Sequence, residues 1–195
     1  MFEIQYIIIG LVQGITEFLP ISSSGHLILI SALTEWEDQG IFTDIAVHVG
    51  TLGAVIIYLR KYIKKIFVDF FSFKTNYFAI NHLWGIKILV ATIPALVVGF
   101  FIYEYLIDYI RNIIVIAWSS IIFGFILFLA DRKKHSTKNW EDLSFWEVFI
   151  VGIFQVLAFI PGASRAGVTI TGARILNIKR ESAAVFSMLL SIPII

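Results

Sequence analysis

Long apolar runs alternate with short charged segments along most of this chain, which is the pattern of a protein that crosses a membrane several times. The run 113–130 is uncharged and long enough to span the hydrocarbon core as one helix. The run 84–103 carries only Lys87, near one end, where a lysine side chain can extend to the interface. A shorter run, 45–59, leads into a basic segment. We predict spanning helices over these three runs.

Two further apolar runs, 4–18 and 145–160, are each too short to cross a bilayer alone. Each leads into a break rich in proline, glycine and serine, around Pro20 and Pro161, and then into another apolar run. Irregular backbone at membrane depth persists only where it is buried in protein or lines a cavity. We therefore predict two re-entrant helix–loop–helix hairpins.

An internal repeat relates the two hairpins. Four pairs of identical residues are separated by 142 positions: Gly10 with Gly152, Gln13 with Gln155, Ser22 with Ser164, and Gly25 with Gly167. The loop after the first hairpin is acidic, whereas basic loops flank the second, so the two copies are expected to enter from opposite faces. The predicted fold is an all-α polytopic membrane protein with inverted-topology repeats. It forms a single integral membrane domain over 1–195, with repeats of about 1–110 and 111–195 and a site near the midplane.

Composition and charge agree with this class. Hydrophobic residues make up 58% of the chain and charged residues 15%, and the mean hydropathy is +0.88, which excludes an ordinary soluble domain. Twelve of the fifteen lysines and arginines fall in the segments 60–74, 131–142 and 174–180, which are therefore predicted to be cytoplasmic loops. The aromatic-rich stretch 66–80 fits either a segment on the inner membrane surface or a plain loop. The chain has no cysteine, which excludes disulfides and thiolate–metal sites.

The apolar run that ends at Ile195 has no polar tail. We therefore expect a longer parent protein in which the second repeat continues.

The most informative polar segment is the first break, Glu17-Phe-Leu-Pro-Ile-Ser-Ser-Ser-Gly-His26. An ionisable group inside an apolar run is expensive to bury and therefore marks a candidate functional site. Glu17 lies one helical turn after Gln13, on the same helix face, and favours a proton or a cation. The serines at 22–24 are good caps for a helix that begins near Gly25, and Ser164 can cap a helix that begins at Arg165 in the same way.

Two helix N-termini would point at one place if the tips of the hairpins meet. Their free N–H groups, together with the guanidinium of Arg165, favour an anion such as phosphate. A divalent metal between Glu17 and a phosphate would reconcile the acid with the anion. Ser23 and His26, three residues apart, then supply a possible nucleophile and a possible proton carrier.

Structural interpretations of the same residues stay open. For Ser22 and Ser24 the favoured interpretation is that of serines that hydrogen-bond nearby carbonyls or hold helices together. Glu17 is also explained by a structural ion pair with Arg165 across the repeat, and His26 by an ordinary buried polar residue. No function is expected of the remaining histidines, His48, His82 and His135. His48 is interpreted as a hydrogen-bonded or hydrated helix residue.

The two breaks resemble the paired motifs of a known family. Gln13-x-x-x-Glu17 running into Phe-Leu-Pro-Ile-Ser-Ser-Ser-Gly-His26, followed by Pro161-Gly-Ala-Ser-Arg165-Ala-Gly-Val-Thr169, is similar to the undecaprenyl-diphosphate phosphatases linked to bacitracin resistance. The resemblance covers essentially the whole chain. It implies a multi-pass enzyme of the bacterial inner membrane that removes the terminal phosphate from undecaprenyl pyrophosphate, which recycles the lipid carrier for peptidoglycan and other wall polymers.

The resemblance also implies the site residues. The functional residues that it implies are Glu17, Ser23, His26 and Arg165. Contacts to the substrate phosphates are expected from the residues around the two helix starts: Ser22, Ser24, Gly25, Ser164, Arg165, Gly167 and Thr169. A divalent cation, Mg²⁺ or Ca²⁺, is implied as well, with Glu17 and Gln13 as its candidate ligands. The expected partners are the polyprenyl pyrophosphate substrate, membrane lipid and a possible second copy of the chain, with no nucleic acid.

Two departures from the family pattern stand out. The second motif usually carries a serine after its arginine, whereas this chain has Ala166. The family's remaining C-terminal helices are also absent from the sequence.

The predicted mechanism has Ser23 attack the terminal phosphorus while His26 takes its proton. Glu17 would hold a metal or position a water, and Arg165 would stabilise the charge that develops on the phosphoryl oxygens. A water activated by Glu17 or His26 is the chief variant. A transporter or flippase for an anionic lipid or a small anion is the alternative function, because inverted repeats with broken helices are also transporter architecture.

Overall fold

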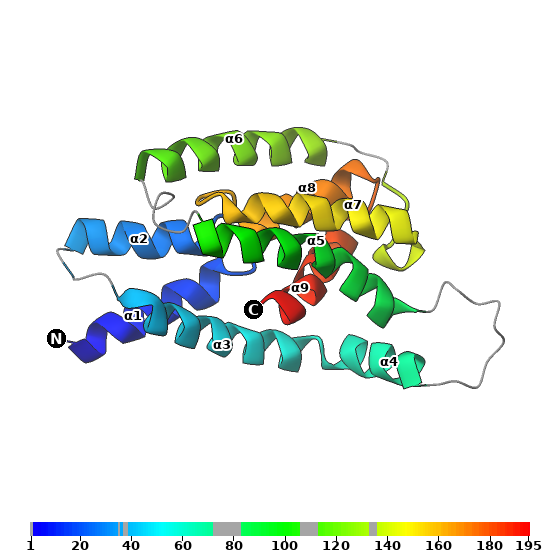
Figure 1. The fold of residues 1–195 in the computed structure, drawn as a ribbon, viewed down its shortest axis with the longest axis horizontal. Helices are drawn as coiled ribbons and strands as arrows, with labels where there is room; N and C mark the ends of the chain where they lie inside the picture. Colours follow the sequence, from blue (N-terminus) through cyan, green and yellow to red (C-terminus); the bar gives the residue numbers. More distant parts are fainter. Residues whose placement is uncertain (1, 35, 37–38, 72–82, 106–112, 133–135) are drawn as a thin grey trace.

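The computed structural model describes residues 2–34, 36, 39–71, 83–105, 113–132 and 136–195. Over these residues the named elements are nine α-helices and two short 3-10 helices. An isolated β-bridge joins Lys138 and Ile178. The all-α class is confirmed. The elements, traced in Figure 1, are α1 (Phe2–Thr16), α2 (Ser23–Thr34), α3 (Gly40–Tyr58), α4 (Arg60–Phe71), α5 (Trp84–Tyr105), α6 (Ile113–Asp131), η2 (Trp140–Asp142), α7 (Phe145–Val156), η3 (Leu157–Phe159), α8 (Arg165–Ile175) and α9 (Arg180–Ile194).

Two of the predicted spans are confirmed by length and composition. Trp84–Ile102 of α5 and Ile113–Asp131, the whole of α6, are long and apolar enough to cross a membrane. A third candidate is the pair Phe42–Tyr58 and Arg60–Val68, which is bent by 73° at the break between α3 and α4. The outer side of α6 carries exposed Trp118, as an apolar helix in contact with lipid would.

The basic segment after α3 is helical in its first part. The charge of 60–74 predicts a loop, whereas the structure forms α4 over residues 60–71. Apolar residues recur on one side of this helix, so charge and helical periodicity coexist there. The rest of the stretch 66–80 lies outside the described residues, as do His82 and His135.

Both breaks lie where the sequence predicts them. In the first, α1 ends at Thr16 and α2 begins at Ser23; in the second, α7 and η3 run to Phe159 and α8 begins at Arg165. The helix after the first break, α2, therefore begins two residues earlier than the expected start near Gly25. The reason is that Ser22 is the capping serine: its Oγ accepts from the N–H of Gly25 at 3.3 Å.

The two breaks share an unusual local geometry. Ser22 and Ser164 have positive φ angles of 59° and 57°, in the left-handed region that residues with a Cβ seldom adopt. Each serine Oγ accepts a hydrogen bond from the glycine N–H three residues later, from Gly25 at 3.3 Å and from Gly167 at 3.2 Å. Such backbone persists only where the surrounding structure holds it, and it concentrates at functional sites.

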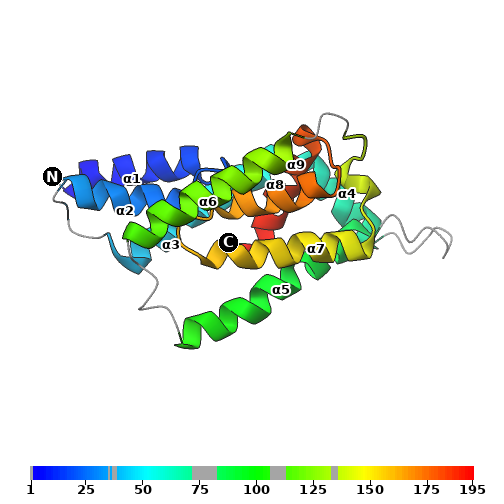
Figure 2. The same ribbon diagram turned by 90° about the horizontal axis from the view of Figure 1, so that it is seen from above.

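Close helix packing holds the second break in place. α7 packs along α5 (Figures 1 and 2), and a Cβ at Gly152 would collide with the carbonyl oxygen of Ala91 in α5. α8 packs between α6 and α9, and the Oγ of Ser119 in α6 donates to the carbonyl of Pro161 in the break. An aromatic group closes the core at the other end of α7, with ring centroids of Trp84 and Trp140 4.5 Å apart.

Candidate active site at the helix breaks

A cavity of about 820 Å³ opens between the two breaks and α3. It is lined by residues from α3, from both breaks and from the end of α7, so segments far apart in the sequence meet at one place. Its polar lining includes Glu17, Ser23, His48, Gln155, Ser164 and Arg165.

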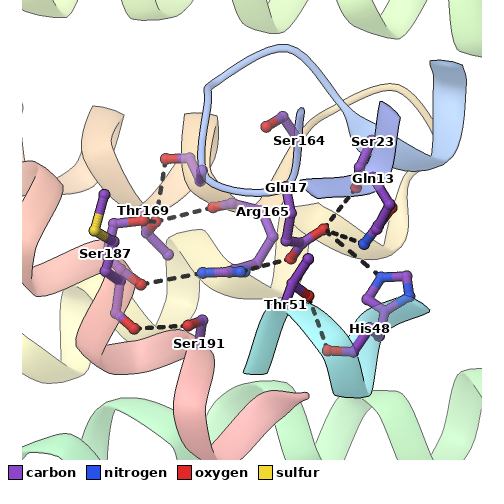
Figure 3. Close-up of polar contacts among 12 residues, drawn as sticks. Gln13, Glu17, Ser23, His48, Thr51, Ser164, Arg165, Thr169, Ser187 and Ser191 are labelled. Carbon is purple, nitrogen blue, oxygen red and sulfur yellow. Dashed lines mark hydrogen bonds and ion pairs between the residues drawn. The ribbon is translucent and has the colours of Figure 1, made fainter. Parts of the chain in front are cut away.

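Glu17 is the centre of the polar contacts. One carboxylate oxygen, Oε1, accepts from Nη2 of Arg165 at 2.7 Å. The other, Oε2, accepts from Oγ of Ser23 at 2.7 Å and from Nε2 of Gln13 at 3.0 Å (Figure 3). The side chain is 7% exposed, so this is a buried carboxylate whose charge is paired and whose oxygens meet three donors.

Arg165 joins the two halves of the molecule. It is the first residue of α8 and it lies 148 positions from Glu17 in the sequence, yet the two side chains are in contact. Its second terminal nitrogen, Nη1, donates to the carbonyl of Ser187 in α9 at 3.1 Å. The hydroxyls of Thr169 and Ser187, 2.7 Å apart, tie α8 to α9 behind it. The guanidinium is therefore held from two sides at the wall of the cavity.

Ser23 has the surroundings of an activated hydroxyl. It lines the cavity at the first turn of α2, and its Oγ donates to the Glu17 carboxylate. A hydroxyl beside a carboxylate that can accept its proton is the arrangement that nucleophilic catalysis requires. The structure thus brings together three of the residues that the sequence singled out, namely Glu17, Ser23 and Arg165.

The two described histidines of this region differ in their relation to the cavity. His26 donates from Nδ1 to the carbonyl of Ser22 at 2.8 Å and does not belong to the lining of the cavity, so the structure does not place it with Ser23. His48 in α3 lines the cavity instead. Its Nδ1 donates to the carbonyl of Asp44 at 2.7 Å, and its Nε2 lies 3.7 Å from Oε2 of Glu17 (Figure 3).

No functional role is predicted for His48 from the sequence, although the sequence contains a usable signal. An ionisable residue inside an apolar helical run is a candidate for a functional site for the same reason as Glu17. The sequence gives no indication that α3 packs beside the first break, so it does not link His48 to Glu17.

The other predicted phosphate contacts divide into two groups. Ser22, Ser24 and Ser164 line the cavity, with the first and last of these capping α2 and α8. Three more lie behind that surface and do not line it: Gly25, Gly167 and Thr169. The Oγ1 of Thr169 contacts the Arg165 carbonyl at 2.9 Å, which is a contact within α8.

The described residues contain no group of three or more His, Cys, Asp or Glu side chains that could hold a metal ion. Both oxygens of Glu17 already meet donors, one of them a cationic guanidinium. Oε1 of Gln13 is buried without a hydrogen-bond partner among the described residues, so it is the one uncommitted oxygen of the candidate pair.

Fold and site together define a class: an integral membrane protein in which broken helices assemble a buried carboxylate, a hydroxyl and a guanidinium around a cavity. The family model "Bacitracin resistance protein BacA" matches residues 6–195, and the chain belongs to this family. A relative from Saccharophagus degradans, "Undecaprenyl-diphosphatase", is 46% identical over 97% of this chain and 71% of its own length. A second, from Idiomarina loihiensis and of the same name, is 44% identical over 98% of this chain and 72% of its own. "Undecaprenyl-diphosphatase 1" from Pseudoalteromonas translucida is 46% identical over 98% and 73%.

Proposed function

We propose that this protein is an undecaprenyl-diphosphatase of the bacterial inner membrane. It hydrolyses undecaprenyl pyrophosphate to undecaprenyl phosphate and inorganic phosphate, recycles the lipid carrier for cell-wall synthesis and confers resistance to bacitracin. The observation that carries the proposal is the chain of contacts from Ser23 through Glu17 to Arg165 at the wall of a cavity. The membership of the family and the names of the relatives support the same activity.

The contacts support a two-step mechanism. Ser23 Oγ attacks the terminal phosphorus and passes its proton to Oε2 of Glu17, which already accepts its hydrogen bond. The bond from that phosphorus to the bridging oxygen breaks, and undecaprenyl phosphate leaves. Water then cleaves the phosphoserine, the proton on Glu17 returns to the Ser23 oxygen, and inorganic phosphate is released.

Arg165 is available at the step that needs it. In the resting site it neutralises Glu17, but a Glu17 that has accepted a proton no longer holds a full charge. The guanidinium is then free to stabilise the charge on the phosphoryl oxygens. Direct attack by water, activated by Glu17 or His26, remains the chief variant, and His26 remains a proposed proton carrier.

We also propose that the two breaks are the tips of inverted repeats that enter the membrane from opposite faces. The matched φ angles and matched caps of Ser22 and Ser164, 142 positions apart, support this arrangement. In it, the basic segments around α4 and between α8 and α9 face the cytoplasm. A homodimer is proposed as the assembly, and the mass of the detergent complex would test it.

A divalent cation, Mg²⁺ or Ca²⁺, is proposed as a companion of the pyrophosphate. When bound it would neutralise phosphate charge. We expect the cation to enter with the pyrophosphate, and no step of the proposed mechanism depends on it. Chelation should therefore lower activity without lowering the unfolding temperature of the substrate-free protein. A cation that stabilises the substrate-free protein would contradict this.

Phosphate release by the purified protein in detergent, from undecaprenyl pyrophosphate, tests the function itself. We expect steady release that stops when Ser23 is replaced. The alternative function, transport of an anionic lipid or small anion, predicts binding of the substrate without release of phosphate. A carrier needs anion donors, but it has no use for a hydroxyl held against a carboxylate.

A further inference from the structure

Gln155 is a buried amide that the packing of the protein does not explain. It lies in the last turn of α7, is 1% exposed and lines the cavity that also contains Arg165. Among the described residues, neither Nε2 nor Oε1 of this side chain has a hydrogen-bond partner. Buried side-chain amides are nearly always paired, so an amide with both atoms unpaired needs a specific reason.

The cost of this amide falls on the stability of the folded protein. Burying a donor and an acceptor without partners is unfavourable, whereas an apolar side chain of similar length would fill the same space without that penalty. The backbone that carries the side chain is not adjustable either. Gly152, one turn earlier, packs against the backbone of Ala91 so closely that a Cβ would collide with it, and this fixes α7 against α5.

The repeat shows what kind of partner the amide lacks. In the first repeat, Gln13 donates its Nε2 to the carboxylate of Glu17, four residues later. Gln155 is the counterpart of Gln13, but the residue four positions after it is Phe159, and both of them line the cavity. The second repeat therefore keeps the amide and lacks the anion. An anion supplied from the cavity would complete the pair.

We propose that Gln155 is a substrate-binding residue whose Nε2 donates to a nonbridging oxygen of the pyrophosphate group. Less than 1 Å² of each amide atom is accessible in the substrate-free structure, so the side chain turns into the cavity as the phosphate enters. A neutral donor is sufficient at this position, because Arg165 already supplies a positive charge to the cavity that the negatively charged substrate enters. The inference rests on the proposed function, since it takes the ligand to be a prenyl pyrophosphate.

The test compares two repeat-related substitutions in the purified full chain, Gln155→Met and Gln13→Met. We expect Gln155→Met to unfold at the same or a higher temperature, because it removes an unpaired amide. Its kcat/KM should fall about tenfold or more, mainly through KM, as for the loss of one hydrogen bond to a charged group. Gln13→Met removes a bond that exists in the folded protein, so it should lower the unfolding temperature as well as the activity.

Thermal stabilisation by farnesyl pyrophosphate, a short-chain prenyl pyrophosphate, separates this inference from the proposed function. Weaker stabilisation of Gln155→Met than of the unsubstituted protein supports the contact, even if no phosphate is released and the hydrolase assignment fails. Equal stabilisation of the two proteins, or an unchanged KM, overturns the proposed contact of Gln155. The hydrolase assignment still stands in that case if the unsubstituted protein releases phosphate. A lower unfolding temperature of Gln155→Met with an unchanged KM would make the residue structural.

Discussion

Glu17 is the residue on which the site depends most, because four side chains lie close to its carboxylate. Its contacts with Arg165, Ser23 and Gln13 are hydrogen bonds, and His48 lies 3.7 Å away. A buried ion pair of this kind stabilises a protein little compared with apolar residues of the same volume. Removing one partner alone costs about 3–5 kcal/mol, because it leaves an uncompensated charge. Loss of activity in a single variant must therefore be separated from loss of folding.

Ser23→Ala is the cleanest test of the nucleophile. The change removes one of three donors to Glu17 and leaves the ion pair with Arg165 intact, so the unfolding temperature should change little. Phosphate release should fall by about 10²-fold or more, as when a nucleophile is lost. Turnover close to normal would replace the covalent route with direct attack by water.

A double-mutant cycle at Glu17 and Arg165 distinguishes a functional pair from a structural one. Arg165→Met alone should lower the free energy of unfolding by about 3–5 kcal/mol, and the double variant Glu17→Gln/Arg165→Met should recover most of it. Phosphate release should be lost in both. A stable double variant that still releases phosphate would show that the pair is only structural.

The two histidines are tested side by side. In the variant in which His26 carries the proton, His26→Ala should lower kcat by about 10²-fold, since a lost general base is worth that much, whereas proton transfer to Glu17 leaves kcat of His26→Ala close to normal. His48→Ala should also lower kcat, because its Nε2 faces Glu17 from within the cavity. Normal turnover in His26→Ala together with a large loss in His48→Ala would transfer the role of proton carrier to His48. Unfolding temperatures serve as the control in both variants.

At the scale of the elements, hydropathy and break chemistry predict most of what the structure contains. The length of the apolar runs identifies α5 and α6, and proline, glycine and serine locate both breaks. The 73° bend between α3 and α4 and the left-handed backbone at Ser22 and Ser164 were not predictable from local pattern. The second break is also held by a segment distant in sequence, since Ser119 in α6 donates to the Pro161 carbonyl, and no local pattern reveals that contact.

The bent pair α3–α4 offers a direct test of orientation, because the chain has no native cysteine. Single cysteines at Phe42, which is 91% exposed at the start of α3, and at Lys64 in α4 mark its two ends. The K/R bias predicts that an impermeant thiol reagent labels Phe42→Cys in intact cells and spares Lys64→Cys until the cells are broken. Labelling of the second variant alone would invert the topology.

At the scale of the whole molecule, the sequence predicted that the two breaks meet, and it said less about the helices that surround them. The offset of 142 positions placed Arg165 opposite the first break, and the contact with Glu17 agrees with it. The placement of α3 was not accessible from the repeat, because α3 has no counterpart among the aligned residues. His48 lies on α3 and was interpreted as an ordinary helix residue, and the absence of His26 from the cavity lining was not foreseen.

The pairing of Glu17 with Arg165 gives the resting cavity an internal counter-ion. An anion that enters must exchange with this carboxylate for the guanidinium, and the gain from the exchange grows with the charge that the anion brings. A pyrophosphate brings more charge than the monophosphate that remains after the reaction. The product therefore competes more weakly with Glu17 for Arg165. When Glu17 pairs with Arg165 again, release of the product is favoured.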